Sequence, residues 1–138
     1  SRMFVNHLVS KGINNVVIGY NKEWKQGINI GKKNNQNFVG IPYYKLLNMI
    51  IYKCELEGIS VIVNEESYTS KCSFIDDEDI CKHDTYCGNR IHRGMFKTSN
   101  GTLINADVNG ALNILKKVIG KFYYNPIKVC STPLVVTP

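Results

Sequence analysis

The chain has 138 residues, of which 43% are hydrophobic and 20% are charged, and a net charge of +6. This composition is typical of one globular domain and excludes a wholly disordered chain. No apolar run approaches the roughly 20 residues that cross a bilayer, so we expect no membrane partner. An odd number of cysteines without a basic-then-apolar leader predicts a reduced, cytoplasmic protein.

The positive charge is unevenly distributed along the chain. Five of the 11 acidic residues fall within residues 76–84, so the remainder is strongly basic. A basic surface suits a polyanionic partner such as nucleic acid. Generic solubility explains the net charge equally well, so charge alone does not identify the partner.

The first predicted elements are a helix and a strand. A helical stripe over residues 2–11 ends at Lys11-Gly12, and residues 15–19 are a short apolar run typical of a buried strand. The polar residues 20–40 predict a long loop. Because the chain begins inside the first helical pattern, we expect a fragment whose earlier part is missing.

The elements after the loop continue the alternation of helices and strands. In chain order we expect a helix, a strand, an irregular insert, a hairpin or short strands that turn at Ser99-Asn100-Gly101, a helix and an extended tail, over residues 42–57, 59–64, 71–90, 91–104, 106–119 and 120–138. Leu46 and Cys54 lie on the apolar stripe of the first of these helices, and we expect Cys54 to be a core thiol. The apolar face expected for the last helix is Val108, Leu112, Leu115 and Ile119. Alternating helices and strands imply an α/β fold with parallel strand pairing.

Several cationic and aromatic residues are candidates for nucleic-acid binding. Trp24 either stacks on a base among neighbouring lysines or pins the polar loop to the body of the protein. Arg90 and Arg93 lie beside the insert, where they either bind phosphates or pair with the nearby acids. The full candidate set is Trp24, Lys25, Lys32, Lys33, Arg90 and Arg93.

Three carboxylates are candidates for catalysis. Asp107 lies at the start of the last predicted helix, and Glu65 and Glu66 follow the end of a predicted strand. In open α/β sheets sites form at that edge, and Mg²⁺ or Mn²⁺ takes oxygen ligands of this kind. A helix start also favours an acidic residue for local reasons, and carboxylates at strand ends are usually solvated. Spacing alone therefore leaves both interpretations open.

A second cluster combines thiols with an imidazole. Cys72, Cys81, His83 and Cys87 follow the spacing C-x8-C-x-H-x3-C. Four such ligands can satisfy tetrahedral Zn²⁺, but a zinc ribbon requires two C-x2-C knuckles and this segment has neither. An acidic loop with scattered cysteines is the competing interpretation.

Four segments together resemble the C-terminal part of the insertion-sequence OrfB/TnpB family of transposon-encoded proteins. They are Asn15–Asn21 with Trp24–Gln26, Gly31–Phe38, Glu65–Phe74 and Asn105–Ile114. The most specific are Tyr68-Thr69-Ser70 and Asn105–Ile114, which reads Asn-Ala-Asp-Val-Asn-Gly-Ala-Leu-Asn-Ile.

The resemblance implies an RNA-guided DNA endonuclease with a RuvC-like, RNase H-type domain, in which a mixed sheet carries flanking helices. It implies DNA and a guide RNA as partners, and divalent metal for hydrolysis of DNA phosphodiester bonds. Asp107 corresponds to the last carboxylate of the RuvC-like metal site. The first catalytic Asp of the family lies upstream of this chain, so the fold is expected to be incomplete at its N-terminus and the fragment inactive.

Two further departures from the family shape the expected site. The middle Glu of many members falls at Gly19, so Glu65 or Glu66 supplies that carboxylate instead, and Glu65 is preferred because it lies nearer the strand end. The position of the family's zinc ribbon is retained without its second knuckle, because residues 96–101 contain no cysteine. A degenerate insert is therefore favoured over a zinc-binding ribbon.

The expected organisation is a RuvC-like core over 1–70, the degenerate zinc-ribbon-like insert over 71–104, the last core helix over 105–119 and the extended tail over 120–138. The alternative function is a non-catalytic nucleic-acid-binding module of a transposase-related protein.

Overall fold

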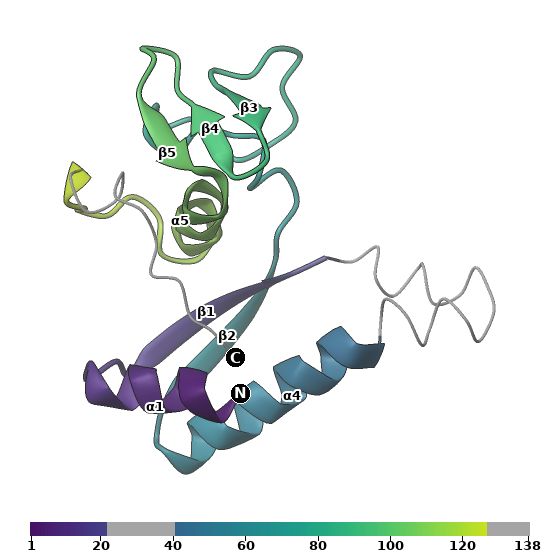
Figure 1. Ribbon diagram of the computed structural model, residues 1–138, viewed down its shortest axis with the longest axis vertical. Coiled ribbons are helices and arrows are strands. Elements are labelled where there is room, and N and C mark those ends of the chain that lie inside the picture. The colour runs from purple at the N-terminus through teal and green to yellow at the C-terminus, as the bar shows by residue number, and fades with distance from the viewer. Residues whose placement is uncertain (22–40, 127–138) are drawn as a thin grey trace. The chain divides into compact units, whose positions relative to one another are not determined.

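The chain forms two compact units, Ser1–Glu65 and Glu66–Pro138, each of which combines helices with a small sheet (Figure 1). The structure is a computed structural model that describes residues 1–21 and 41–126. The candidates Trp24, Lys25, Lys32 and Lys33 lie outside the described residues. Within the described ranges, no helix has both the length and the apolar character needed to cross a membrane.

In the described part of the first unit, residues 1–21 and 41–65, there are two helices and two parallel strands. They are α1 (Arg2–Ser10), β1 (Asn15–Tyr20), α4 (Ile41–Leu56) and β2 (Ser60–Glu65). The register runs from Asn15 opposite Ser60 to Tyr20 opposite Glu65. Parallel neighbours need a long crossover connection, and here the crossover includes α4. The predicted α/β alternation with parallel pairing is therefore confirmed.

The core of the first unit lies between the helices and one face of the strands. Its buried members are Val5, Leu8, Cys54 and Ile59, with Val16, Ile50 and Val61 packed against them. Cys54 is fully buried, and burial raises the pKa of its thiol, so the predicted core thiol is confirmed. The sequence also predicts Leu46 on this apolar stripe. That prediction is wrong, because Leu46 is 45% exposed.

The strands of the first unit are less buried than the sequence predicts. Val16 and Val61 lie opposite each other and both reach the core, whereas Ile62 is 41% exposed. Successive side chains of a strand point to opposite faces, so the residues that follow this pair face away from the core. The prediction of a fully buried strand over 15–19 is wrong for that reason.

The described part of the second unit contains an antiparallel sheet followed by a helix. The strands are β3 (Asn89–His92), β4 (Met95–Lys97) and β5 (Leu103–Asn105), in the order β3-β4-β5. The predicted turn at Ser99-Asn100-Gly101 joins β4 to β5, and Gly101 adopts a φ of +89° that favours glycine. A hairpin or short strands were expected from residue 91, and β3 begins two residues earlier, inside the segment predicted to be irregular.

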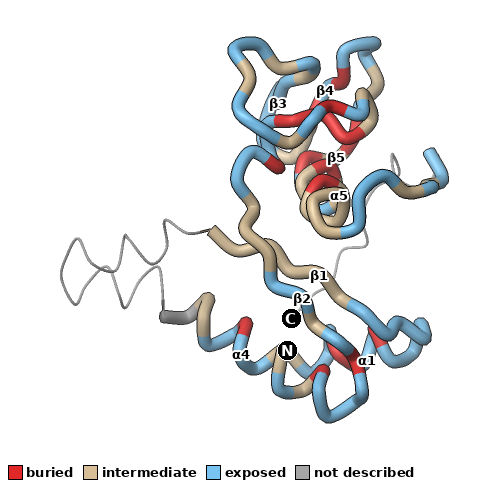
Figure 2. The backbone as a smooth tube through the Cα atoms, turned by 180° about the vertical axis from the view of Figure 1, so that it is seen from behind, coloured by how far each residue is buried: buried red, intermediate tan, exposed pale blue. Residues whose placement is uncertain are grey.

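Helix α5 (Ala106–Ile119) follows β5 directly and has the predicted bounds. Phe96, Ile104 and Ala106 form the buried core between helix and sheet, with Val108 and Leu112 packed beside them (Figure 2). The expected apolar face is wrong at Ile119, whose side chain is 56% exposed. The fully buried positions of α5 are instead two polar residues, Asn109 and Asn113.

The first prediction concerns the start of α5. The Oδ1 atom of Asn105 accepts hydrogen bonds from the backbone N–H groups of Asp107 and Val108, at 2.9 and 3.2 Å. We expect Asn105→Ala to lower the free energy of unfolding by about 1 kcal/mol, because two helix-start N–H groups lose their partner. Asn105→Ser should retain most of the stability. Equal unfolding midpoints for Asn105→Ala and wild type in urea titrations would contradict the capping role.

Candidate functional site

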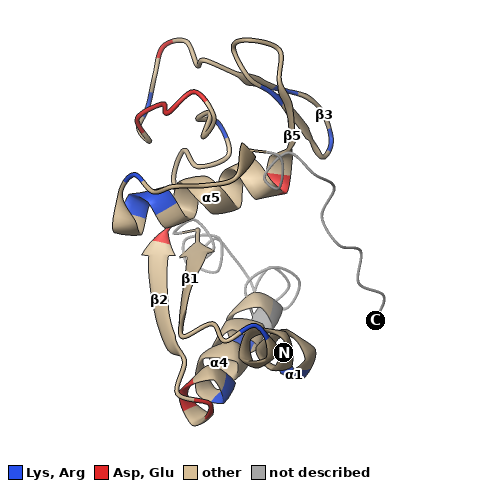
Figure 3. Ribbon diagram, turned by 90° about the vertical axis from the view of Figure 1, so that its left-hand side faces the viewer, with Lys and Arg blue, Asp and Glu red and all other residues tan. Residues whose placement is uncertain are grey.

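Asp107 lies in the first turn of α5 with its side chain exposed to solvent. The two ends of the helix have opposite charge, acidic at Asp107 and basic at Lys116 and Lys117 (Figure 3). Each charge is favourable with respect to the helix dipole. Because Asn105 already caps the backbone, the Asp107 carboxylate is not needed as the N-cap, and its oxygens face outward.

Asn109, two residues after Asp107, holds α5 against the segment that contains Cys72 and Phe74. Its side chain is fully buried, accepts a hydrogen bond from the backbone N–H of Phe74 at 3.0 Å, and donates to the backbone oxygen of Cys72 at 2.9 Å. Both partners belong to one irregular segment that has no helix or strand partner for these groups. The side-chain amide of Asn109 therefore supplies the hydrogen bonds that a neighbouring strand would otherwise give these two backbone groups.

Asn113, one helical turn later, repeats this arrangement. Its Nδ2 donates to the backbone oxygens of Thr69 and Cys72, at 2.9 and 2.8 Å. We call Asn109 and Asn113 the asparagine latch. The latch joins the segment Asn105–Ile114 to the segment that begins with Tyr68-Thr69-Ser70, which are the two most specific blocks of the sequence resemblance.

The latched segment is itself a tight turn. Tyr68 has a φ of +66°, in the left-handed region, and the Thr69 hydroxyl donates to the backbone oxygen of Glu66 at 2.7 Å. A β-strand that ends at Glu65 is thereby followed at once by a fixed turn, and the latch ties this turn to the helix that carries Asp107.

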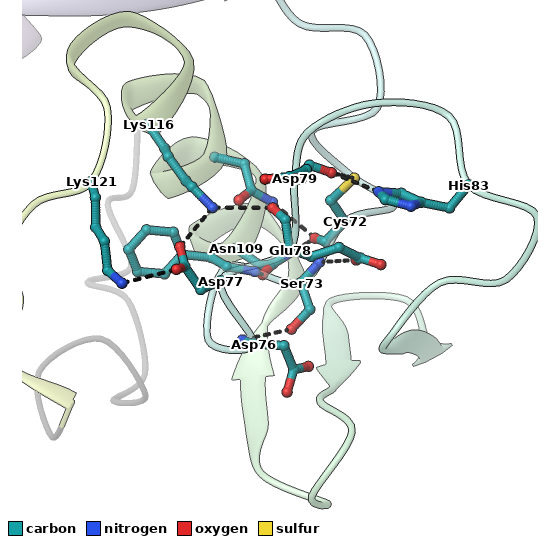
Figure 4. Close-up of polar contacts among 12 residues, drawn as sticks. Cys72, Ser73, Asp76, Asp77, Glu78, Asp79, His83, Asn109, Lys116 and Lys121 are labelled. Carbon is teal, nitrogen blue, oxygen red and sulfur yellow. Dashed lines mark hydrogen bonds and ion pairs between the residues drawn. The ribbon is translucent and has the colours of Figure 1, made fainter.

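Glu78 is a buried carboxylate that the sequence did not single out. Its side chain accepts hydrogen bonds from the backbone N–H groups of Ser73 and Cys87, at 2.8 and 2.9 Å. Lys116 of α5 donates to the Glu78 backbone oxygen at 3.1 Å (Figure 4). Glu78 thus connects two loops and the helix, and the only sequence signal was its place in an acidic run.

The acidic run is partly neutralised from α5 and the segment after it. Asp77 pairs with Lys116 at 2.9 Å and with Lys121 at 3.0 Å, and hydrogen bonds from both lysines lower the pKa of Asp77 (Figure 4). Asp76 accepts hydrogen bonds from the backbone N–H and the hydroxyl of Ser99. These acids therefore hold the insert in place and do not act only as solvated charges.

The predicted zinc ligands have unlike environments. Cys72 is fully buried, and its Sγ donates to the backbone oxygens of Asp79 and Cys81, at 3.4 and 3.6 Å. Burial raises the pKa of the Cys72 thiol, and the neighbouring Glu78 carboxylate raises that of Cys87.

The fourth member of this set is His83, whose Nε2 lies 3.5 Å from Cys81 Sγ and 2.7 Å from the backbone oxygen of Asp79. Among the described residues, no three His, Cys, Asp or Glu side chains are placed to hold a metal ion. A closed structural zinc site needs four such ligands. Zinc at Cys72, Cys81, His83 and Cys87 stays a prediction.

The two glutamates occupy different units. Glu65 is the last residue of β2 and lies opposite Tyr20, beside the Gly19–Asn64 pair, at the carboxyl edge of the parallel strands. Glu66 begins the second unit, which also contains Asp107. Glu65 therefore lies at the strand edge next to Gly19, as the sequence predicts. Which glutamate shares a metal with Asp107 stays a prediction.

The donor chemistry of these carboxylates suits a hard divalent cation. Mg²⁺ is bound through one or two protein carboxylates and keeps several waters, so it does not need a cluster of three protein ligands. Asp107 offers exposed carboxylate oxygens on a fixed helix start. A carboxylate of this kind is the type of ligand that a hard divalent cation takes.

The predicted phosphate contacts separate into two locations. Arg90 lies on β3 and lines a groove of about 340 Å³ together with Lys71 and Tyr86. Arg93 is exposed in the turn between β3 and β4. Sequence reasoning missed Lys71, because nothing in the pattern showed that it would face the same groove as Arg90.

Comparison with known proteins places the chain in a family. The family model described as "Cas12f1-like, TNB domain" matches residues 43–114, which is more than half of the chain. This chain belongs to the TnpB/OrfB family. The matched residues include both halves of the asparagine latch and Asp107.

Two relatives extend the match over most of the chain. The CRISPR-associated endodeoxyribonuclease Cas12f1 of Sulfoacidibacillus thermotolerans is 40% identical over 101 residues, which cover 72% of this chain and 22% of that protein. The TnpB-like protein ORF457 of Acidianus two-tailed virus is 30% identical over 126 residues, which cover 86% of this chain and 24% of that protein. The TnpB/OrfB chain described above thus spans about a quarter of the length of these relatives.

The second prediction tests the asparagine latch. Asn109→Ala should lower the free energy of unfolding by about 2 kcal/mol, because the buried Phe74 N–H loses its acceptor. Asn6→Ala is the matched control, since Asn6 is exposed on α1 and should change stability by less than about 0.5 kcal/mol. Chemical unfolding followed by circular dichroism measures both. Equal losses in the two variants would contradict the latch.

Proposed function

We propose that this chain is part of a RuvC-like nuclease domain that hydrolyses DNA phosphodiester bonds with Mg²⁺ or Mn²⁺. The observation that carries the proposal is the exposed Asp107 carboxylate on a helix start that the asparagine latch fixes against the turn after Glu65 and Glu66. Its family membership and its similarity to a protein named as an endodeoxyribonuclease support the reaction class.

In this proposal the chain contributes two of the carboxylates of the site. Asp107 holds the metal from the start of α5, and Glu65 at the end of β2 is the second ligand, with Glu66 as the alternative. A bound divalent ion stabilises the charge that develops on the phosphoryl oxygens and activates water. The asparagine latch acts indirectly in this proposal. It sets the position of the Asp107 carboxylate and does not contact the substrate.

The partners proposed for the full-length protein are target DNA and a guide RNA, and the proposed location is the cytoplasm. The sequence resemblance implies both partners, and the surplus of cationic residues outside the acidic segment 76–84 suits them. Zinc is not required by this proposal, since Glu78 and the asparagine latch already hold the insert through hydrogen bonds.

A non-catalytic nucleic-acid-binding module is the second candidate function. The observation in its favour is the groove lined by Lys71 and Arg90, which lies within the second unit and does not depend on a metal. The two functions differ in one measurable respect: only the nuclease needs the Asp107 carboxylate for activity.

The third prediction concerns Asp107 in the full-length protein. Asp107→Asn should reduce metal-dependent DNA cleavage by about a hundredfold or more, because a metal ligand contributes several kcal/mol to transition-state stabilisation. The exposed side chain makes the cost in stability less than about 1 kcal/mol. Asp84→Asn, another exposed acid of the second unit, is the control and should cleave normally. If Asp107→Asn cleaved DNA at the wild-type rate, Asp107 would not be a metal ligand of the site.

The fourth prediction concerns the 138-residue chain by itself. We expect the purified chain to leave plasmid DNA intact with Mg²⁺ or Mn²⁺, because the resemblance implies a further catalytic Asp that this chain does not supply. Plasmid relaxation assays over a range of metal concentrations measure this. Cleavage that disappears with a chelator and in the Asp107→Asn variant would show that the chain is sufficient.

A further inference from the structure

Glu78 places a buried carboxylate inside the insert of the second unit. The residue is 6% exposed, and both of its carboxylate oxygens have partners (Figure 4). Oε1 accepts a hydrogen bond from the backbone N–H of Ser73 at 2.8 Å, and Oε2 accepts one from the backbone N–H of Cys87 at 2.9 Å. Hydrogen bonds to an ionised acceptor are stronger than those between neutral groups. Glu78 therefore joins the start of the insert firmly to the segment that precedes β3.

The two segments that Glu78 joins are the ones that carry the predicted zinc ligands. Cys72 directly precedes Ser73, and Cys87 itself donates its backbone N–H to Glu78. The Cys87 thiol also forms a hydrogen bond with the Glu78 carboxylate, which raises the pKa of that thiol. A zinc ion in this insert would join the same two segments, through Cys72 and Cys87. The carboxylate and the metal would thus perform the same structural task in the same place.

The charge of a zinc centre conflicts with this carboxylate. Zn²⁺ bound by the thiolates of Cys72, Cys81 and Cys87 and by the imidazole of His83 would carry a net negative charge, because three thiolates outweigh the charge of the ion. Glu78 would add a second negative charge beside it, and like charges repel strongly where water is excluded. The N–H groups of Ser73 and Cys87 cannot stabilise the thiolates, since both donate to Glu78. This donor set therefore does not fit zinc.

The surroundings of the Cys72 sulfur agree with this assignment. Cys72 is fully buried, and its Sγ lies 3.4 Å from the backbone oxygen of Asp79 and 3.6 Å from that of Cys81. Both oxygens are hydrogen-bond acceptors, which suit a thiol that retains its proton. Cys72 is thus packed as a small neutral side chain, as free buried cysteines usually are.

We infer that Glu78 is the anionic centre that holds this insert together in place of a metal ion, and that Cys72, Cys81, His83 and Cys87 do not bind zinc. Lys116 donates to the Glu78 backbone oxygen at 3.1 Å, so the same centre is tied to the helix that carries Asp107. The inference concerns the folding of the insert and does not depend on the proposed nuclease reaction. If that reaction is correct, its dependence on divalent metal reports the Asp107 site alone.

Metal content and chelator sensitivity test the inference on the wild-type protein. Protein produced in zinc-supplemented medium should contain zinc far below a stoichiometric amount by plasma mass spectrometry. Limited proteolysis, with the cleavage sites mapped by mass spectrometry, measures how often the insert opens. The rate of cleavage within residues 71–104 should be the same with and without EDTA. A stoichiometric amount of zinc, or faster cleavage of the insert in EDTA, would overturn the inference.

The Glu78 carboxylate is tested by a substitution of nearly equal shape. Glu78→Gln should be cleaved within the insert about tenfold faster than wild type, because the amide nitrogen cannot accept a hydrogen bond and the charge is lost. Asp84→Asn makes the matching carboxylate-to-amide change at an exposed position of the same insert and should be cleaved at the wild-type rate. Equal cleavage of the two variants would show that Glu78 is not the centre of the insert.

A second variant tests the thiols even if Glu78→Gln does not fold. Cys81→Ser/Cys87→Ser replaces two exposed thiols and retains a hydroxyl donor for Glu78. Its insert should be cleaved within about twofold of the wild-type rate, since exposed substitutions cost little stability. A zinc centre would lose two of its four ligands, so rapid cleavage of this double variant would overturn the inference. Asp107→Asn should resemble wild type in all of these assays, which separates this inference from the nuclease proposal.

Discussion

Two buried asparagine side chains hold the second unit together. Asn109 and Asn113 lie on the face of α5 that would ordinarily be apolar, and they satisfy backbone groups of residues 69–74 that no helix or strand serves. Unsatisfied buried groups are costly, so this turn and α5 can pack together only in one register. The position of the Asp107 carboxylate, two residues before Asn109 on the same helix, follows from that register.

The acidic run has a structural role that changes the electrostatics of the chain. Glu78 binds two backbone N–H groups, and Asp77 pairs with Lys116 and Lys121. These acidic side chains bind partners in the insert, in α5 and at Lys121, and none of them lines the groove that contains Lys71 and Arg90. A basic groove can therefore exist in the same unit as the most acidic segment of the sequence, which the net charge alone does not show.

The regular elements were predictable because local signals specify them. The structure shows that Asn105 caps α5 and that Gly120 follows its last residue, and the apolar runs predicted the two parallel strands. The buried amides were not recognised, because hydrophobic periodicity assigns polar residues to the surface, and only tertiary hydrogen bonds reverse that. The start of β3 and the role of Glu78 were also not recognised. The Glu78 carboxylate accepts hydrogen bonds from backbone N–H groups of the irregular insert, and the pattern of side-chain types does not show such contacts. The catalytic role proposed for Asp107 came from the family resemblance, and the exposure of this residue on a fixed helix start is consistent with the proposal.

We propose that Asp107 is a metal ligand and that the asparagine latch sets its position. The most direct measurement is the anomalous scattering of Mn²⁺ soaked into crystals of the wild-type chain and of Asp107→Asn. The account predicts manganese density at the Asp107 carboxylate, shared with Glu65 or Glu66, and its loss in the variant. Density that persists in Asp107→Asn, or that occurs only along the acidic run of residues 76–79, would contradict it.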